Sequence, residues 1–260
     1  MHDDTPNHLA RSVETLGRAA FPAALERWLA VELAQDNFTV LAYFDGRRPL
    51  SMARSARMSA VHENFDQVYV SGAYLLDPFH DLHTHRAPSG VYRLSDVAPD
   101  QFHRNPYYLD YYSATTLLDE LAFVTSPAPG ISVQICLGRD SSSNTRFSAR
   151  ELTRAHRIAP VVVALADRHW AGLDAQGEYS GTSVTDRLRD ALDQAHGIRL
   201  SPRQAEVTLL ILRGHSSVSI GLELGISPQT VKVFRKQIYR KCEISSQAEL
   251  FNLMLPLLGV

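Results

Sequence analysis

The sequence predicts an α+β protein with two domains, of which the first mixes strands with helices and the second is entirely helical. Runs of β-branched and aromatic residues alternate with helical patterns up to about residue 170. A stretch rich in Gly and Ser at 171–183 follows, and only helical patterns occur after it. We therefore expect an α-β-α sandwich at 1–172, a linker and connecting helix at 173–195, and a four-helix domain at 196–260.

The first domain begins with a helical leucine pattern over residues 9–35, interrupted at Pro22. The run FTVLAYF at 38–44 ends at Asp45-Gly46, which predicts a strand and a turn with a return strand at 50–57. Residues 61–72 have a helical pattern, and Asp77-Pro78 opens a short helix.

The second half of this domain is predicted to contain the strands 90–94, 118–125 and 131–137. The last two flank the turn Pro-Ala-Pro-Gly at 127–130, so they are expected to form a hairpin. Ser148 and Glu151 have the spacing of a capping box, which predicts the start of a long helix to about residue 170.

The C-terminal domain is marked by capping residues. A helix is predicted at 184–195, with Gly197 as its end. Ser201-Pro202 starts the next helix and Gly214 ends it, a shorter helix follows at 218–224, and a third covers 228–242 after the turn Gly225-Ile226-Ser227. A fourth begins at Ser245 or Ser246. Two helices joined by a three-residue turn form the arrangement that places a recognition helix in the major groove of DNA.

The helix at 228–242 has two different faces. Its predicted buried stripe consists of Val231, Phe234, Ile238 and Cys242. The opposite face presents cations, an amide and a small apolar group, which are the groups that read base edges and phosphates: Gln229, Lys232, Val233, Lys236 and Arg240. Arg235 and Lys241 flank the stripe, where phosphate contacts are expected.

Charge supports the same interpretation. Residues 199–260 carry a net charge of +4, whereas the preceding part carries −6, which together give the formal charge of −2. A basic helical face alone is more often only solvated, but the caps, the turn spacing and the four-helix layout together favour DNA binding.

The run LSPRQAEVTLLILRGHSSVSIGLELGISPQTVKVFRKQIYRKCEISSQAEL resembles the LuxR/GerE-type DNA-binding domain. The resemblance implies that Lys232, Val233 and Lys236 reach bases and that the fourth helix helps to form a dimer. The sequence departs from the family pattern where Phe234 replaces a frequent histidine and Gly221 a frequent alanine. A glycine inside a helix costs about 1 kcal/mol, so the helix at 218–224 is expected to be less stable.

The first domain does not fit two common sensor types. A phosphoreceiver domain and a P-loop ATPase both need a lysine, and no lysine precedes Lys232. Part of the pattern instead resembles acyl-homoserine-lactone sensors, which have a PAS- or GAF-like fold. Phe65, Tyr69, Asp77-Pro78 and Tyr92 match the family series Trp, Tyr, Asp-Pro and Trp, although the interval from Tyr69 to Asp77 is one residue short.

The resemblance implies a ligand site at Phe65, Tyr69, Asp77 and Tyr92, and Tyr74 is a further aromatic candidate. In that family the first tryptophan donates to the lactone carbonyl and the aspartate accepts from the ligand amide. Phe65 has no donor, so we expect a ligand other than a standard acyl-homoserine lactone. Asp77 is equally explained as the cap of the helix that begins at Pro78, and both roles can coexist.

Several other classes of protein are not favoured by the sequence. The two cysteines fit neither a disulfide framework nor a zinc site. For the cluster His80, His83 and His85, a solvated helix is expected rather than a metal site. No catalytic motif, cofactor motif or apolar run of about 18 residues occurs, so neither an enzyme nor a membrane protein is expected, and a cytoplasmic location follows.

The sequence thus predicts a homodimeric transcription regulator that binds a double-stranded operator and is controlled by a small molecule, with RNA polymerase as a further candidate partner. The alternative is a constitutive dimeric DNA-binding regulator whose first domain serves only dimerisation. A pocket lined by Tyr69, Asp77 and Tyr92 would favour sensing, and a filled core the alternative.

Overall fold

The computed structural model describes residues 5–175 and 183–258. Contacts divide the chain into two compact units, and one of the boundaries between them falls within helix α3 (Pro78–Thr84). The first unit takes its residues from 1–63, 82–97 and 116–180, and the second from 64–81, 98–115 and 181–260. Two stretches of the predicted sensor thus belong to the same unit as the C-terminal helices. The predicted domain boundaries remain a proposal, and most of the predicted linker lies outside the described residues.

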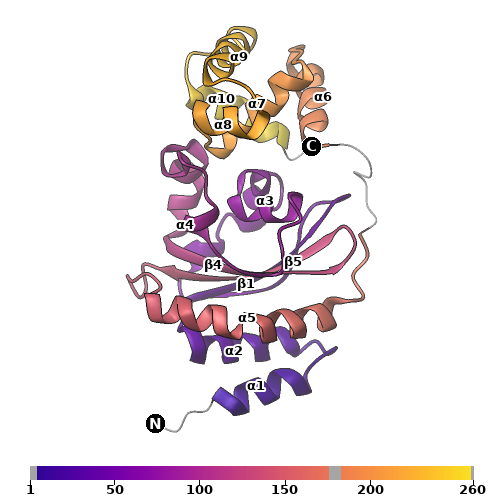
Figure 1. Ribbon diagram of the computed structural model, residues 1–260, viewed down its shortest axis with the longest axis vertical. Coiled ribbons are helices and arrows are strands. Elements are labelled where there is room, and N and C mark those ends of the chain that lie inside the picture. Colours follow the sequence, from indigo (N-terminus) through magenta and orange to yellow (C-terminus); the bar gives the residue numbers. More distant parts are fainter. Residues whose placement is uncertain (1–4, 176–182, 259–260) are drawn as a thin grey trace. The chain divides into compact units, whose positions relative to one another are not determined.

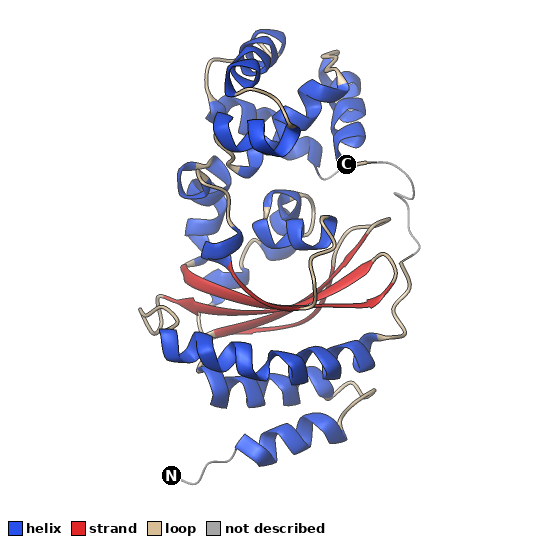
Figure 2. Cartoon of the chain, in the orientation of Figure 1, coloured by secondary structure: helices blue, strands red, loops and turns tan. Residues whose placement is uncertain are grey.

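The first unit is built on a five-stranded antiparallel sheet with the strand order β2-β1-β5-β4-β3 (Figures 1 and 2). The strands are β1 (Asn37–Phe44), β2 (Leu50–Ala56), β3 (Gly90–Arg93), β4 (Leu117–Ala128) and β5 (Ile131–Asp140). The predicted hairpin is confirmed because β4 and β5 pair antiparallel on either side of Gly130, whose φ of 73° suits the turn. All residues of β1 and β5 are buried, so both faces of the sheet centre are covered.

Helices α2 (Phe21–Leu33) and α5 (Ala149–Trp170) cover one face of the sheet, and α1 (Thr5–Glu14) packs on α2 (Figure 1). Every second residue of β1, including Phe38, Val40 and Ala42, belongs to the core under α2 and α5. On the opposite face, His83 of α3 stacks near Tyr43 of β1, and α4 (Leu94–Val97) follows β3. Pro22 lies in the first turn of α2, so the predicted interruption falls before this helix, at residues 15–20.

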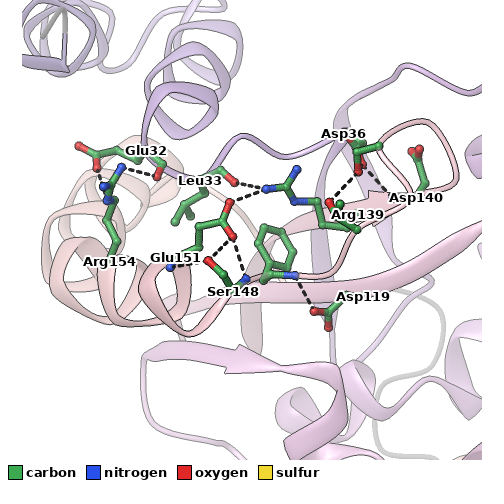
Figure 3. Close-up of polar contacts among 12 residues, drawn as sticks. Glu32, Leu33, Asp36, Asp119, Arg139, Asp140, Ser148, Glu151 and Arg154 are labelled. Carbon is green, nitrogen blue, oxygen red and sulfur yellow. Dashed lines mark hydrogen bonds and ion pairs between the residues drawn. The ribbon is translucent and has the colours of Figure 1, made fainter.

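A polar network fixes the ends of α2 and α5 beside β5 (Figure 3). The guanidinium of Arg139 on β5 donates to the carbonyl of Leu33 at 3.3 Å and to Glu151 at 2.5 Å. Glu151 also completes the predicted capping box with Ser148. A single buried arginine therefore joins the end of α2 to the first turn of α5, since it satisfies a terminal carbonyl of one helix and a carboxylate of the other.

The second unit contains the helices α6 (Val184–His196), α7 (Pro202–Arg213), α8 (Ser217–Leu224), α9 (Pro228–Lys241) and α10 (Gln247–Leu258). The two earlier segments of this unit consist mainly of single helical turns. Segment 64–81 contains the turns Phe65–Tyr69 and Ala73–Leu76, and segment 98–115 contains the turns Phe102–Arg104, Tyr107–Tyr111 and Tyr112–Thr115. The continuous helix predicted over 61–72 is wrong, because that stretch forms a 3₁₀ turn at Ser59–His62 and then a π turn.

The predicted fold class, with mixed strands and helices followed by helices alone, is confirmed. The C-terminal caps also lie where they were predicted. Ser201 forms a capping box with Gln204, Ser227 caps α9, and Gly214 and Gly225 end their helices with positive φ. None of the described helices is long and apolar enough to cross a membrane.

Candidate DNA-binding face and candidate ligand site

The turn between α8 and α9 is closed by short backbone contacts. Ile226 donates its N–H to the carbonyl of Gly221 at 2.9 Å. A Cβ on Gly221 would lie 2.7 Å from the carbonyl oxygen of Ile226. This glycine, which departs from the family pattern, therefore allows α8 and the turn to approach closely, and this contact offsets its low helix propensity.

The outward face predicted for α9 is exposed. Gln229, Lys232, Lys236 and Arg240 are exposed side chains, and Val233 is 48% exposed. On the other side Val231 and Ile238 are fully buried and Cys242 is buried, whereas Phe234 is only half-buried. The helix therefore packs through one stripe and presents three cations and an amide opposite to it.

The two flanking cations have partners within the protein. The Lys241 ammonium donates to the carbonyl of Arg199 at 2.7 Å and to Oε1 of Gln204 at 2.9 Å. Arg235 is half-buried and lies 3.4 Å from both the Tyr239 hydroxyl and Oε1 of Gln247. These contacts tie α9 to the start of α7 and to α10, a role that charge alone did not reveal.

Helix α10, the helix that the resemblance links to dimer formation, buries part of its apolar side within the chain. Phe251 and Leu258 are buried and Leu255 is half-buried, whereas Ala248 is exposed. Helices α6 and α7 and the turn Ala73–Leu76 all contact α10.

The candidate ligand residues of the second unit are gathered around Asp77. The Tyr69 hydroxyl donates to one carboxylate oxygen of Asp77 at 2.7 Å, and the Phe79 N–H donates to the other at 2.8 Å. The Phe65 ring stacks on Tyr69 with ring centroids 5.0 Å apart, and Tyr74 lies 6.5 Å from Tyr69. Tyr69, Phe65, Tyr74 and Asp77 thus form one cluster, and Asp77 also caps α3 as the alternative explanation predicted.

Two residues extend or limit this cluster. Tyr111 stacks on Tyr69 with centroids 6.2 Å apart. It was not among the predicted site residues because it lies far along the chain from Tyr69. Tyr92 belongs to β3 in the other unit, where its hydroxyl donates to the carbonyl of Pro88 at 2.6 Å. Its contribution to the same site therefore stays a prediction.

Asp77 is electrostatically unusual. Burial of its carboxyl raises the pKa to about 6, although the hydrogen bonds from Tyr69 and Phe79 oppose the rise. Within the described part of the chain, no basic side chain forms an ion pair with it. A carboxylate without a counter-ion in such a position is costly for folding alone, which is typical of functional sites.

The expectation of a solvated helix at the histidine cluster is wrong for His80 and His83, which are both buried. His83 bonds Ser132 at 2.9 Å and lies 3.3 Å from Asp45. Burial lowers the pKa of His83 to about 4, and Asp45 opposes that shift. Among the described residues, no group of three acidic, histidine or cysteine side chains is placed to hold a metal ion.

The helices, the exposed basic face and the turn define a helix-turn-helix transcription regulator. Residues 199–254 match the family described as "Bacterial regulatory proteins, luxR family". A protein of Aeromonas salmonicida, whose name describes an HTH-type transcriptional regulator in the exeN 3′ region, is 31% identical over 185 residues. The match covers 69% of this chain and 93% of that protein. The chain therefore belongs to the LuxR family of DNA-binding transcription regulators, which is not a class of enzymes.

A comparison with a solved structure supports the fold. The crystal structure of the VqsR LBD domain from Pseudomonas aeruginosa has a TM-score of 0.55 and 23% identity. The alignment covers 65% of this chain and 98% of that domain. Escherichia coli SdiA aligns over 96% of this chain and 94% of its own, with a TM-score of 0.42 and 15% identity.

Proposed function

We propose that this transcription regulator is controlled by a small molecule that binds at Asp77. The observation that supports this proposal is the environment of the Asp77 carboxyl, which is buried among aromatic rings. Two neutral groups donate hydrogen bonds to it, and no cation among the described residues forms an ion pair with it. A carboxylate accepts up to about four hydrogen bonds, so the group has capacity for a ligand donor.

The chemistry of the cluster indicates the ligand class. Asp77 suits an amide or amine N–H, and the rings of Phe65, Tyr69, Tyr74 and Tyr111 suit an apolar body. Phe65 cannot donate to a lactone carbonyl. The name of the VqsR domain, which is similar in fold, supports a ligand-binding role for this part of the chain.

The experiment that tests this proposal is mass spectrometry of small molecules released from the protein after purification from its native host. We expect a compound with an N–H group to accompany the wild-type chain and to be lost from the Asp77→Asn variant, whose amide offers one acceptor in place of two. If both chains release the same compounds, Asp77 does not bind the ligand.

A second variant tests the donor argument. Phe65→Trp introduces an indole N–H, and it should raise affinity for an acyl-homoserine lactone about tenfold if the missing donor is what prevents binding. Phe65→Tyr is a control that adds a polar group at a different position. Equal affinities in all three chains would contradict the argument.

The DNA-facing part of the proposal is that Gln229, Lys232, Val233, Lys236 and Arg240 contact the operator. Their common exposure on one side of α9 supports it. We further propose that the protein acts as a homodimer, partly through α10, and that RNA polymerase is a partner at the promoter.

The constitutive alternative has one supporting observation, namely that Asp77 accepts the Phe79 N–H and therefore has a structural role at α3. In that case no small molecule would accompany the wild-type chain, and DNA binding would be insensitive to extracts of the host.

A further inference from the structure

A small cavity lies wholly within the first unit. Its volume is about 340 Å³, which is in the range of small-molecule sites. Three segments supply its walls, namely α2 through Glu26 and Ala30, residues 35–37, which lead from α2 into β1, and residues 55–57 around the end of β2. None of these residues belongs to the cluster around Asp77, so the cavity is a separate candidate site.

The path of the chain creates this cavity. Ala34 follows α2 with a φ of 50°, a left-handed conformation that turns the chain out of the helix. Asn37 then begins β1 opposite Ala56 of the edge strand β2. The N–H of Arg57 donates to the carbonyl of Asp36 at 3.1 Å, which holds the end of β2 beside the connection. The cavity is the space that α2 and these two segments leave between them.

The carboxylate of Asp36 in this wall is fully engaged by the chain, and the residue is 4% exposed. One of its oxygens accepts the N–H of Asp140 at 3.0 Å (Figure 3) and also the hydroxyl of Ser143. The other oxygen lies 3.1 Å from Nη1 of Arg57. The negative charge of Asp36 is therefore paired with the Arg57 guanidinium.

Gln35 provides a buried acceptor that has no partner. The side chain lines the cavity, and the residue is 6% exposed. Its Nε2 donates to the backbone carbonyl of Glu26 at 3.3 Å, which identifies Oε1 as the free end of the amide. Within the described part of the chain, no donor bonds this oxygen. A buried amide oxygen without a partner is costly, so the group indicates a donor that comes from outside the chain.

Glu26 contributes a second acceptor to the same cavity. The residue is half-buried, and its Oε1 accepts the hydroxyl of Ser55. None of the described residues donates to its Oε2 or forms an ion pair with the carboxylate. Glu26 therefore carries a negative charge that the described chain does not neutralise, and it shares the cavity with the amide oxygen of Gln35.

We propose that this cavity binds a small organic cation through a primary ammonium group. Such a group has three N–H donors and a positive charge, which match the two free acceptors and the charge of Glu26. A hydrogen bond from a cation to a carboxylate is stronger than a neutral one, and partial burial strengthens it further. The small side chains of Ala30 and Ala56 leave room for a short apolar tail. An anion would be repelled by Glu26, since the guanidinium of Arg57 is already paired with Asp36.

Two variants of the full-length chain alter the cavity in different ways. Glu26→Gln removes the charge and retains an acceptor for the Ser55 hydroxyl. Ala30→Leu, at an exposed position of α2, fills the cavity without changing either acceptor. The matched controls are Glu63→Gln and Ala23→Leu, which make the same changes at exposed positions outside the cavity. Ala23 lies on the same side of α2 as Ala30, about two turns earlier.

The probe is propylammonium chloride, which is titrated into each isotope-labelled chain and followed by backbone NMR. In the wild type we expect saturable shifts centred on residues 26–37 and 55–57. Both cavity variants should weaken binding about tenfold or more, because one loses a charged hydrogen bond and the other the space for the ligand. Both controls should bind as the wild type does. Tetramethylammonium, which has the charge but no N–H, should bind the wild type about tenfold more weakly or worse.

The proposal is overturned if the wild type shows no saturable shifts with propylammonium or binds tetramethylammonium equally well. It is also overturned if a cavity variant with the wild-type circular dichroism spectrum keeps the wild-type affinity. Shifts centred on residues 65–81 instead would assign the cation to the Asp77 cluster and would equally contradict this site. Because the two sites share no residue, the proposed function is decided separately, by the compounds that the wild-type and Asp77→Asn chains release.

Discussion

At the scale of single residues, Asp77 stabilises the folded chain less as its carboxyl ionises. The pKa of the group is about 6 in the folded protein against its ordinary value of 3.8, so the folded state binds the proton more tightly. Stability linked to this group is therefore present below about pH 3.8 and is lost as the pH rises through about 6.

The Asp77→Asn variant lacks this titration. Relative to that variant, the wild type should lose about 2 to 3 kcal/mol of unfolding free energy between about pH 4 and pH 7. Urea denaturation at both pH values measures the difference, with the exposed Asp96→Asn as a control. A difference that does not change with pH would show that Asp77 ionises normally.

The stability linked to His83 depends on pH in the opposite sense. Its folded-state pKa is about 4 against 6.5, since burial disfavours the charged ring. Stability is therefore lost as the pH falls from about 6.5 to about 4, by at most about 3 kcal/mol. His83→Gln should reduce this acid sensitivity, whereas the exposed His85→Gln should not. Equal slopes of stability against pH in both variants would contradict the assignment.

At the scale of elements, α9 carries two kinds of cation. Some face outward, and one forms hydrogen bonds that hold the helical domain together. Lys232 and Lys236 are exposed, whereas the Lys241 ammonium donates to Arg199 and Gln204 near the start of α7. Substitution by alanine should therefore lower stability at Lys241 and operator preference at Lys232.

Lys241→Ala should lower the unfolding free energy by about 1 kcal/mol, because two hydrogen bonds of a charged group are lost. Lys232→Ala should change stability by less than about 0.5 kcal/mol, but it should reduce the preference for the operator over random DNA. Urea denaturation and duplex binding at several salt concentrations separate the two effects. A loss of stability in Lys232→Ala alone would reverse the assignment.

At the scale of the whole molecule, charge is divided unevenly along the chain, with the basic excess confined to residues 199–260. We expect binding to DNA to weaken steeply with salt, because each phosphate contact releases counterions. We also expect a dimer that binds half-sites about one DNA turn apart. Sedimentation with and without a two-half-site duplex measures this, and a monomer that binds one-to-one with full affinity would contradict it.

The sequence by itself determined the elements whose signals are local. Ser201, Ser227, Gly214 and Gly225 mark helix ends because a cap needs only its own side chain or φ and the next turn of backbone. The run of β-branched and aromatic residues in β1 and the turn that ends at Gly130 likewise predicted strands. The outward face of α9 followed from angular spacing alone.

Only the tertiary structure decided the contacts between distant residues. The pairing of Tyr69 and Tyr111, the burial of His83 against β1 and β5, the bond from Lys241 to Arg199 and the capping of α7 by Asn105 have no local signature. Each joins residues from separate elements, and the long-range packing of those elements sets the distance between them. The sequence therefore indicated which groups were available for a site, and the fold decided which of them meet.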